Sequence, residues 1–153
     1  MKYLKRELYE KLNNNGTKED EEEWVIANES YMEAFKCSKQ KLPQAFVNIY
    51  ENNFGFHDAN IERINILFNN RETTIQLLMD GVGYYGEKYT VLLKEVRNFE
   101  ADFMNIDTPL GGIKEFNYSE ILLAENKHIS WEIDLFNSTM RVEFKKIEIE
   151  SNN

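Results

Sequence analysis

The spacing of apolar residues changes near residue 57, and this change constrains the fold most. Before it, apolar side chains recur every three or four positions, as Leu4, Leu8 and Leu12 do, which predicts amphipathic helices. After it, apolar and polar residues alternate, which predicts half-buried strands. We therefore expect an α+β chain, in which N-terminal helices pack on a mostly antiparallel sheet of about five or six strands.

Three helices are predicted within residues 1–56. Asparagines and Gly16 end the first helix. Thr17 is expected to cap the second helix, with Asp20 completing a capping box. The acidic run at 19–23 is therefore interpreted as a helix start, because carboxylates stabilise helix N-termini. Pro43 suits the first turn of the third helix.

Residues 57–150 form the β-rich part, and its first hairpin can be registered from the sequence. Folding the chain at Asn70-Arg71 gives one apolar face and predicts these opposite pairs: Ile66 with Ile75, and Ile64 with Leu77. Two further strands are expected at 89–96 and 115–124. The segment 98–114 between them contains Pro109 and two adjacent glycines, and is predicted to be a connection.

A second hairpin is predicted near the end of the chain, with its turn at Asn137-Ser138. The expected apolar pairs are Leu135 with Met140, Ile133 with Val142, and Trp131 with Phe144. The polar face would pair Asp134 with Arg141, and Glu132 with Glu143. A β-bulge at Lys145-Lys146 would return Ile147 and Ile149 to the buried face.

Size and composition favour one domain over residues 1–153. The chain is 42% hydrophobic and 13% aromatic, which supplies one packed core. The single cysteine, Cys37, cannot form an internal disulfide, which favours a reducing compartment. The first residues lack the apolar region of a signal peptide, and no apolar run is long enough to span a membrane. A cytoplasmic location is therefore expected.

The charge balance favours some partners and disfavours others. The net charge is −9, and no cluster of lysines and arginines forms the basic stripe that nucleic-acid binding requires. An acidic surface instead attracts a basic protein.

His57-Asp58 is the first candidate site, because this dipeptide ligates metal in metal-dependent HD phosphohydrolases. Those enzymes also need an upstream histidine, and none precedes His57. The structural interpretation is that Asp58 bonds backbone amides at the helix-to-strand turn. A zinc site combining His57, His128 and Cys37 lacks the local ligand spacing of such sites. We expect no cofactor and no catalytic residue from motifs of this kind.

The segment 81–86 matches the GxGxxG pattern of dinucleotide-binding loops. That fingerprint requires a helix after the loop, whereas the residues that follow favour a strand. We therefore expect a hairpin loop, in which Tyr84 and Tyr85 either contact a partner or pack onto the sheet. Together with the acidic strand face of Glu132, Asp134 and Glu143, this loop is the predicted partner-binding surface.

Two segments of the chain resemble a family of small Gram-positive bacterial proteins, known as a domain of unknown function. They are the opening Met1-Lys2-Tyr3, with Lys5 and Glu7-Leu8-Tyr9-Glu10, and the segment Phe56-His57-Asp58-Ala59-Asn60-Ile61. The resemblance implies a helical N-terminal part, a β-rich C-terminal part and a cytoplasmic setting, and it assigns no catalytic residue.

The sequence therefore favours a non-enzymatic, immunity-like binding protein that inhibits a basic partner. The alternative is a metal-assisted hydrolase using His57 and Asp58. Neither the identity of the partner nor the oligomeric state follows from the sequence.

Overall fold

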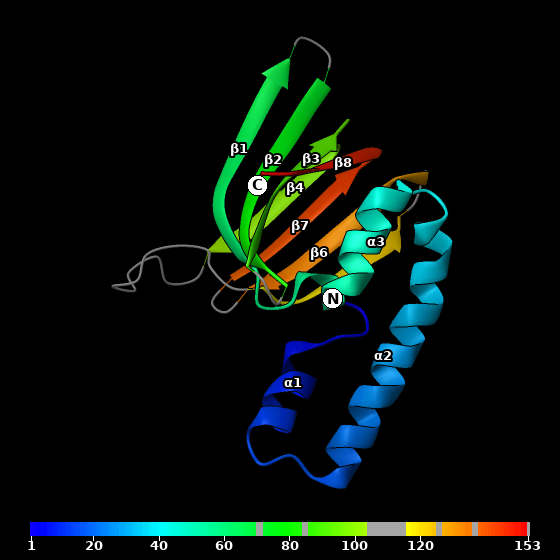
Figure 1. The fold of residues 1–153 in the computed structure, drawn as a ribbon. Coiled ribbons are helices and arrows are strands. Elements are labelled where there is room, and N and C mark those ends of the chain that lie inside the picture. The colour runs from blue at the N-terminus through cyan, green and yellow to red at the C-terminus, as the bar shows by residue number, and fades with distance from the viewer. Residues whose placement is uncertain (70–71, 84–85, 104–115, 125–126, 136–137, 153) are drawn as a thin grey trace.

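The computed structural model describes residues 1–69, 72–83, 86–103, 116–124, 127–135 and 138–152. Within them, three helices precede the strands (Figure 1): α1 (Arg6–Asn13), α2 (Lys18–Lys39) and α3 (Gln44–Asn52), followed by the short 3-10 helix η1 (Phe54–Phe56). The strands are β1 (Asn60–Asn69), β2 (Glu72–Val82), β3 (Glu87–Lys94), β4 (Asn98–Phe103), β5 (Phe116–Leu123), β6 (Ile129–Leu135), β7 (Ser138–Phe144) and β8 (Lys146–Ser151).

The strands form two four-stranded antiparallel sheets, which confirms the α+β fold. The first sheet has the order β1-β2-β3-β8, and the second has the order β4-β7-β6-β5. The sequence predicted five or six strands because the segment 98–114 was assigned to a connection. Its first residues instead form β4, which pairs with β7.

The chain passes between the two sheets at two adjacent points, after β3 and after β7. Backbone bonds link these crossings: Arg97 N donates to Glu143 O at 2.8 Å, and Lys145 N donates to Lys94 O at 3.2 Å. The interruption predicted at Lys145 is therefore present. It is a change of sheet rather than a bulge, and it places Ile147 in the core, where this side chain is 2% exposed.

The two predicted hairpin registers had different outcomes. In the first hairpin, Ile66 lies opposite Ile75, as predicted. In the second, Trp131 pairs with Val142 and not with Phe144, so the predicted register was wrong by two residues. A shift of two keeps every side chain on its predicted face, since side chains alternate along a strand. It also removes the unfavourable Glu–Glu pair that the predicted register contained.

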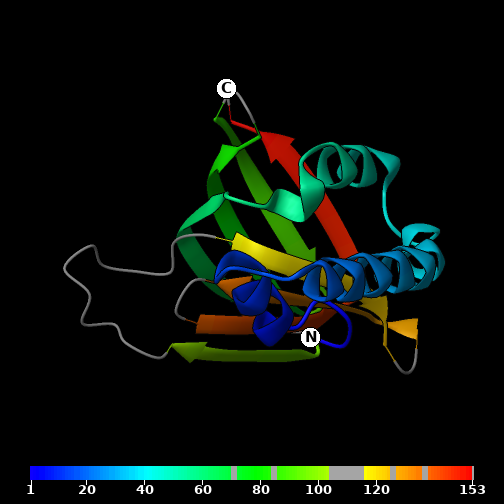
Figure 2. The same cartoon turned by 90° about the horizontal axis from the view of Figure 1, so that it is seen from below.

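The start of α2 is as predicted, whereas Leu4 lies before α1 and Pro43 is the N-cap of α3 rather than a residue of its first turn. Thr17 and Asp20 form the predicted capping box at the start of α2. This helix packs along β5 of the second sheet, and α1 packs against α2 (Figure 2). No helix in the described part of the chain is long and apolar enough to cross a membrane.

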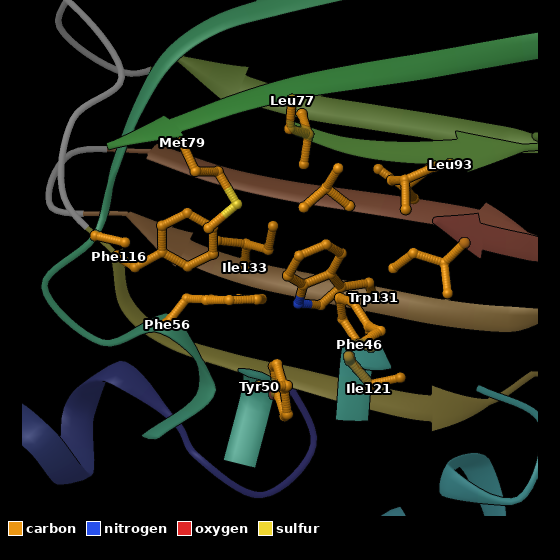
Figure 3. Close-up of a cluster of buried hydrophobic side chains, with 14 of the residues drawn as sticks. Phe46, Tyr50, Phe56, Leu77, Met79, Leu93, Phe116, Ile121, Trp131 and Ile133 are labelled. Atoms are coloured by element: carbon orange, nitrogen blue, oxygen red, sulfur yellow. The ribbon is translucent and has the colours of Figure 1, made fainter. Parts of the chain in front are cut away.

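The core lies between the two sheets, and α3 and η1 close it on one side (Figure 3). At its centre is Trp131, which is fully buried. The ring centroids of Phe46, Phe56 and Phe116 lie 5.8, 5.9 and 6.3 Å from that of Trp131. Packing of these aromatic rings against Trp131 fixes the position of the second sheet. The opposite face of this sheet is polar.

Candidate functional site: the acidic face of the second sheet

The face of the second sheet that points away from the core carries most of its charge. One row of directly opposed residues crosses all four strands in the order Glu120, Glu132, Arg141 and Glu100. The neighbouring rows add Asp134 and Asp102 on one side, and Glu143 on the other. We call these six carboxylates the acidic face: Glu100, Asp102, Glu120, Glu132, Asp134 and Glu143. Arg141 lies among them.

The N-terminal segment covers the half of the acidic face formed by β5 and β6. The carboxylate of Glu120 is fully buried and accepts backbone N–H bonds from Lys2 at 2.8 Å, from Tyr3 at 2.7 Å and from Leu4. The amino group of Met1 lies 3.0 Å from Glu132 Oε1. Charge-assisted bonds of this kind hold the segment on the sheet.

Arg6, the first residue of α1, completes this cover. Its Nη2 lies 2.5 Å from Asp134 Oδ1 and donates to Leu135 O at 2.8 Å. Asn117 Nδ2 donates to the same carboxylate at 3.1 Å. Asp134 is 3% exposed, so its charge is compensated inside the molecule and contributes little to the outer surface.

The other half of the acidic face is open. A hollow of about 240 Å³ lies over β4 and β7, lined by Glu100, Ala101, Asp102, Glu132, Thr139, Met140 and Arg141. Arg141 Nη2 lies 2.9 Å from Glu143 Oε1, and its Nε donates to Ser130 Oγ at 3.3 Å. These bonds direct the guanidinium towards Glu143. They leave the exposed carboxylates of Glu100 and Asp102 on the other side of the hollow.

The three carboxylates predicted to bind a partner do share one strand face, but their surroundings differ. Asp134 is buried beneath Arg6, whereas the side chains of Glu132 and Glu143 are 31% and 17% exposed. Whether any of them binds a partner stays a prediction. The other predicted contact residues, Tyr84 and Tyr85, lie outside the described residues.

Sequence reasoning missed Glu100 and Asp102. Their signal was present, since apolar and acidic residues alternate from Phe99 to Asp102 as they do in a half-buried strand. Proline and glycine further along the segment 98–114 outweighed it.

Tyr118 of β5 lies opposite Asp134 of β6, and its ring contacts both α1 and α2. Its ring lies 4.5 Å from that of Tyr9 in α1 and 4.8 Å from that of Trp24 in α2, measured between centroids. Burial, with a hydrogen bond to Tyr9, raises the pKa of Tyr118 far above its usual value. The phenol therefore stays protonated beside the carboxylates.

His57 and Asp58 lie at the turn after η1, whereas Cys37 is exposed on α2 and His128 directly precedes β6. His57 Nδ1 lies 2.8 Å from Asp58 Oδ1. The segment 81–86, here the glycine segment, begins beside this turn: a Cβ at Gly81 would lie 3.9 Å from Asp58 O. That segment links β2 to β3, which are antiparallel, and this supports the hairpin interpretation over a dinucleotide site. Among the described residues there is no group of three or more metal-ligating side chains.

Comparison with known proteins identifies a family without assigning an activity. No curated protein matches the sequence. The fold is similar to the crystal structure of an uncharacterized protein from Neisseria gonorrhoeae, with 16% identity and a TM-score of 0.45, over 62% of this chain and 92% of that chain. The family described as protein of unknown function (DUF4085) matches residues 1–131. With most of its length matched, this chain belongs to the DUF4085 family.

Proposed function

We propose that this protein is a non-enzymatic, cytoplasmic binding protein whose acidic face receives a basic segment of another protein, in the manner of an immunity-type inhibitor. The observation that carries the proposal is the open hollow over β4 and β7. Glu100 and Asp102 are exposed there, and Glu132 and Arg141 form its floor with them.

Charge supports a basic occupant of this hollow. The open half of the acidic face has three carboxylates, those of Glu100, Asp102 and Glu143, against the guanidinium of Arg141, while Glu132 at its border lies beside the amino group of Met1. An incoming arginine can form two parallel bonds to a carboxylate, which gives direction as well as affinity. The net charge of −9 would raise the rate of encounter with a cationic partner.

The test is a titration of the isotope-labelled protein with an arginine-rich peptide, followed by amide chemical shifts. We expect shifts centred on β4 and β7 that weaken as salt is raised, because exposed charges are screened. Glu100→Gln with Asp102→Asn should reduce the affinity about tenfold, which corresponds to about 1.4 kcal/mol. The same peptide with glutamate in place of arginine should not bind.

The matched control removes the same charge elsewhere. Glu22→Gln with Glu29→Gln changes two exposed carboxylates of α2 and should leave the affinity within about twofold, since only the long-range field changes. Equal losses in the two double variants would contradict a site at the hollow. A second contact is proposed for the glycine segment, and Tyr84→Ala with Tyr85→Ala tests it against a captured partner.

The alternative function is a metal-assisted hydrolase at His57 and Asp58. The observation in its favour is backbone strain, because φ is +48° at Phe54, +66° at Phe56 and +65° at Asp58. Strain of this kind in residues other than glycine clusters at functional sites. Stoichiometric metal that is lost in His57→Ala would support the hydrolase. A melting temperature unchanged by zinc, manganese or magnesium would count against it, because a ligand of the native state stabilises that state.

A further inference from the structure

The edge strands of the two sheets differ in how they are protected. In the second sheet, β5 is covered by α2, and the backbone N–H of Ile121 donates to Tyr31 Oη at 3.0 Å. The other edge, β4, carries Glu100 and Asp102. In the first sheet, β8 alternates charge along its length, with Lys146, Glu148 and Glu150. Cover and charge are the usual means of preventing edge strands from pairing with other chains.

The remaining edge, β1, lacks this protection over its second half. Residues 64–69 read Ile-Asn-Ile-Leu-Phe-Asn, without a charge, a proline or a glycine. Three of these side chains are exposed, Ile66 by 41%, Leu67 by 48% and Phe68 by 79%. In Figure 1 the β1–β2 hairpin extends beyond the ends of β3 and β8. An uncharged, apolar edge of this length is a template for strand pairing.

We propose that β1 pairs with β1 of a second copy of this chain, antiparallel and about a two-fold axis at Ile66. The pattern of the strand is complementary to itself in this register. Ile66 faces its own equivalent, and Ile64 faces Phe68 of the second copy. All three belong to one face, because Ile64 and Ile66 lie opposite Leu77 and Ile75 of β2. The two first sheets would become one sheet of eight strands.

The pattern of charges along β1 is compatible with a second copy as the occupant. In the proposed register, Arg63 faces Asn69 of the second copy, whose neighbour on β2 is Glu72. Each Arg63 would therefore face a neutral amide, and the carboxylate of Glu72 is engaged on the far side by the backbone N–H of Glu95 at 3.2 Å. No two like charges face each other between residues 63 and 69, since Arg63 is the only charged residue in that range.

The interface would be small, and the protein is strongly acidic. One strand from each copy buries less than the roughly 800 Å² per partner of a standard interface, so dimers should form only at high concentration. The net charge of −9 repels a second copy, and added salt screens this repulsion. Salt should therefore strengthen self-association, whereas it weakens binding of a basic partner. The two proposals are independent and give opposite salt responses.

The first experiment is sedimentation velocity of the purified protein from about 10 to about 500 µM, a range suited to a weak interface. We expect monomer at the low end and dimer at the high end, with more dimer at higher salt. Phe68→Lys should shift the midpoint at least tenfold upwards, and this exposed position leaves the core intact. Ile26→Lys, at an equally apolar site on α2 that is 63% exposed, should behave as the unmodified protein.

The second experiment tests the register by disulfide trapping in a Cys37→Ser background, because Cys37 is exposed. Ile66→Cys should cross-link on oxidation, since opposed Cα atoms lie roughly 4.5–5.5 Å apart, within the limit of about 7 Å for a disulfide. Asn69→Cys should not, since its equivalent would lie about 20 Å away along the strand.

A protein that stays monomeric at about 500 µM would overturn the proposal and leave the edge open to an extended peptide of another protein. Equal dimerisation of Phe68→Lys and the unmodified chain would also overturn it, as would cross-linking of Asn69→Cys in preference to Ile66→Cys.

Discussion

The hydroxyl oxygens of Tyr31 and Tyr50 lie 2.9 Å apart, and through this bond α2 and α3 share one attachment to the second sheet. Tyr50 Oη donates to Ser119 O at 3.0 Å, and Tyr31 Oη accepts from the backbone N–H of Ile121 at 3.0 Å. Both tyrosines are buried. The network therefore satisfies polar groups of an edge strand that water does not reach.

Removing the Tyr50 hydroxyl should destabilise the fold. In Tyr50→Phe, the hydroxyl of Tyr31 and the carbonyl of Ser119 lose a buried partner, and we expect a cost of about 1–3 kcal/mol in the free energy of unfolding. Urea denaturation measures it. Tyr3→Phe, at a partly buried ring of the N-terminal segment, is the control and should cost less. If both variants lose the same free energy of unfolding, the hydrogen bonds of the Tyr50 hydroxyl do not stabilise the fold.

The same tyrosine makes stability depend on alkaline pH. Burial raises the pKa of Tyr50 to about 12, whereas a tyrosine in the unfolded chain titrates near pH 10. The stabilisation is therefore fully present below about pH 10 and is lost as pH rises towards 12. Urea midpoints measured between about pH 8 and 11.5 should fall at the alkaline end. They should fall less steeply in Tyr50→Phe, and an identical slope would contradict the assignment.

Arg6 and Asp134 should be strongly coupled. Arg6→Ala leaves the buried carboxylate of Asp134 without its cation, and we expect a loss of about 1–3 kcal/mol. In an Asp134→Asn background, the same substitution should cost much less, because no charge is then left unpaired. A double-mutant cycle measured by urea denaturation gives the coupling energy. Additive effects would mean that the N-terminal segment is held without this pair.

Trp131 should tolerate phenylalanine better than alanine. Its indole N–H is buried and has no hydrogen-bond partner among the residues that the structure describes, so Trp131→Phe removes only part of the ring volume. Trp131→Ala opens a cavity between the sheets and should cost about 3–5 kcal/mol. Thermal unfolding of the two variants gives the comparison. Equal destabilisation would indicate that the indole N–H does have a partner.

Two glycines of the segment 81–86 should respond differently to alanine. Both have positive φ, +67° at Gly83 and +65° at Gly86, so each substitution carries a backbone cost of about 1 kcal/mol. A Cβ at Gly83 would also fall 2.1 Å from Asn53 Oδ1, whereas a Cβ at Gly86 would have no neighbour within 4 Å in the described part of the chain. Asn53 cannot move freely, because its Nδ2 donates to Ile49 O at 2.8 Å.

Gly83→Ala should therefore lower the melting temperature clearly more than Gly86→Ala does. If the two variants melt together, Asn53 rearranges without cost and the glycine segment is not fixed against α3.

Local patterns predicted much of the fold correctly. The capping box of Thr17 and Asp20 depends on residues three apart, and the first hairpin on residues separated by a short turn. Interactions over such short separations are set by side-chain chemistry and by the alternation of side chains along a strand. The second hairpin shows the limit of this reasoning, because two registers that differ by two residues bury the same face.

The outward face of the second sheet depended on contacts that no local pattern contains. Glu120 appeared to be an ordinary strand residue, yet it is buried beneath backbone amides more than a hundred positions earlier in the chain. The same fold brings Arg6 onto Asp134 and leaves Glu100 and Asp102 uncovered. The sequence by itself determined where the helices end, where the strands other than β4 begin and which of their side chains face the core, because periodicity and capping act locally. Only the tertiary structure decided which carboxylates are neutralised and which stay open, because compensation of a charge depends on distance in space and not on separation along the chain.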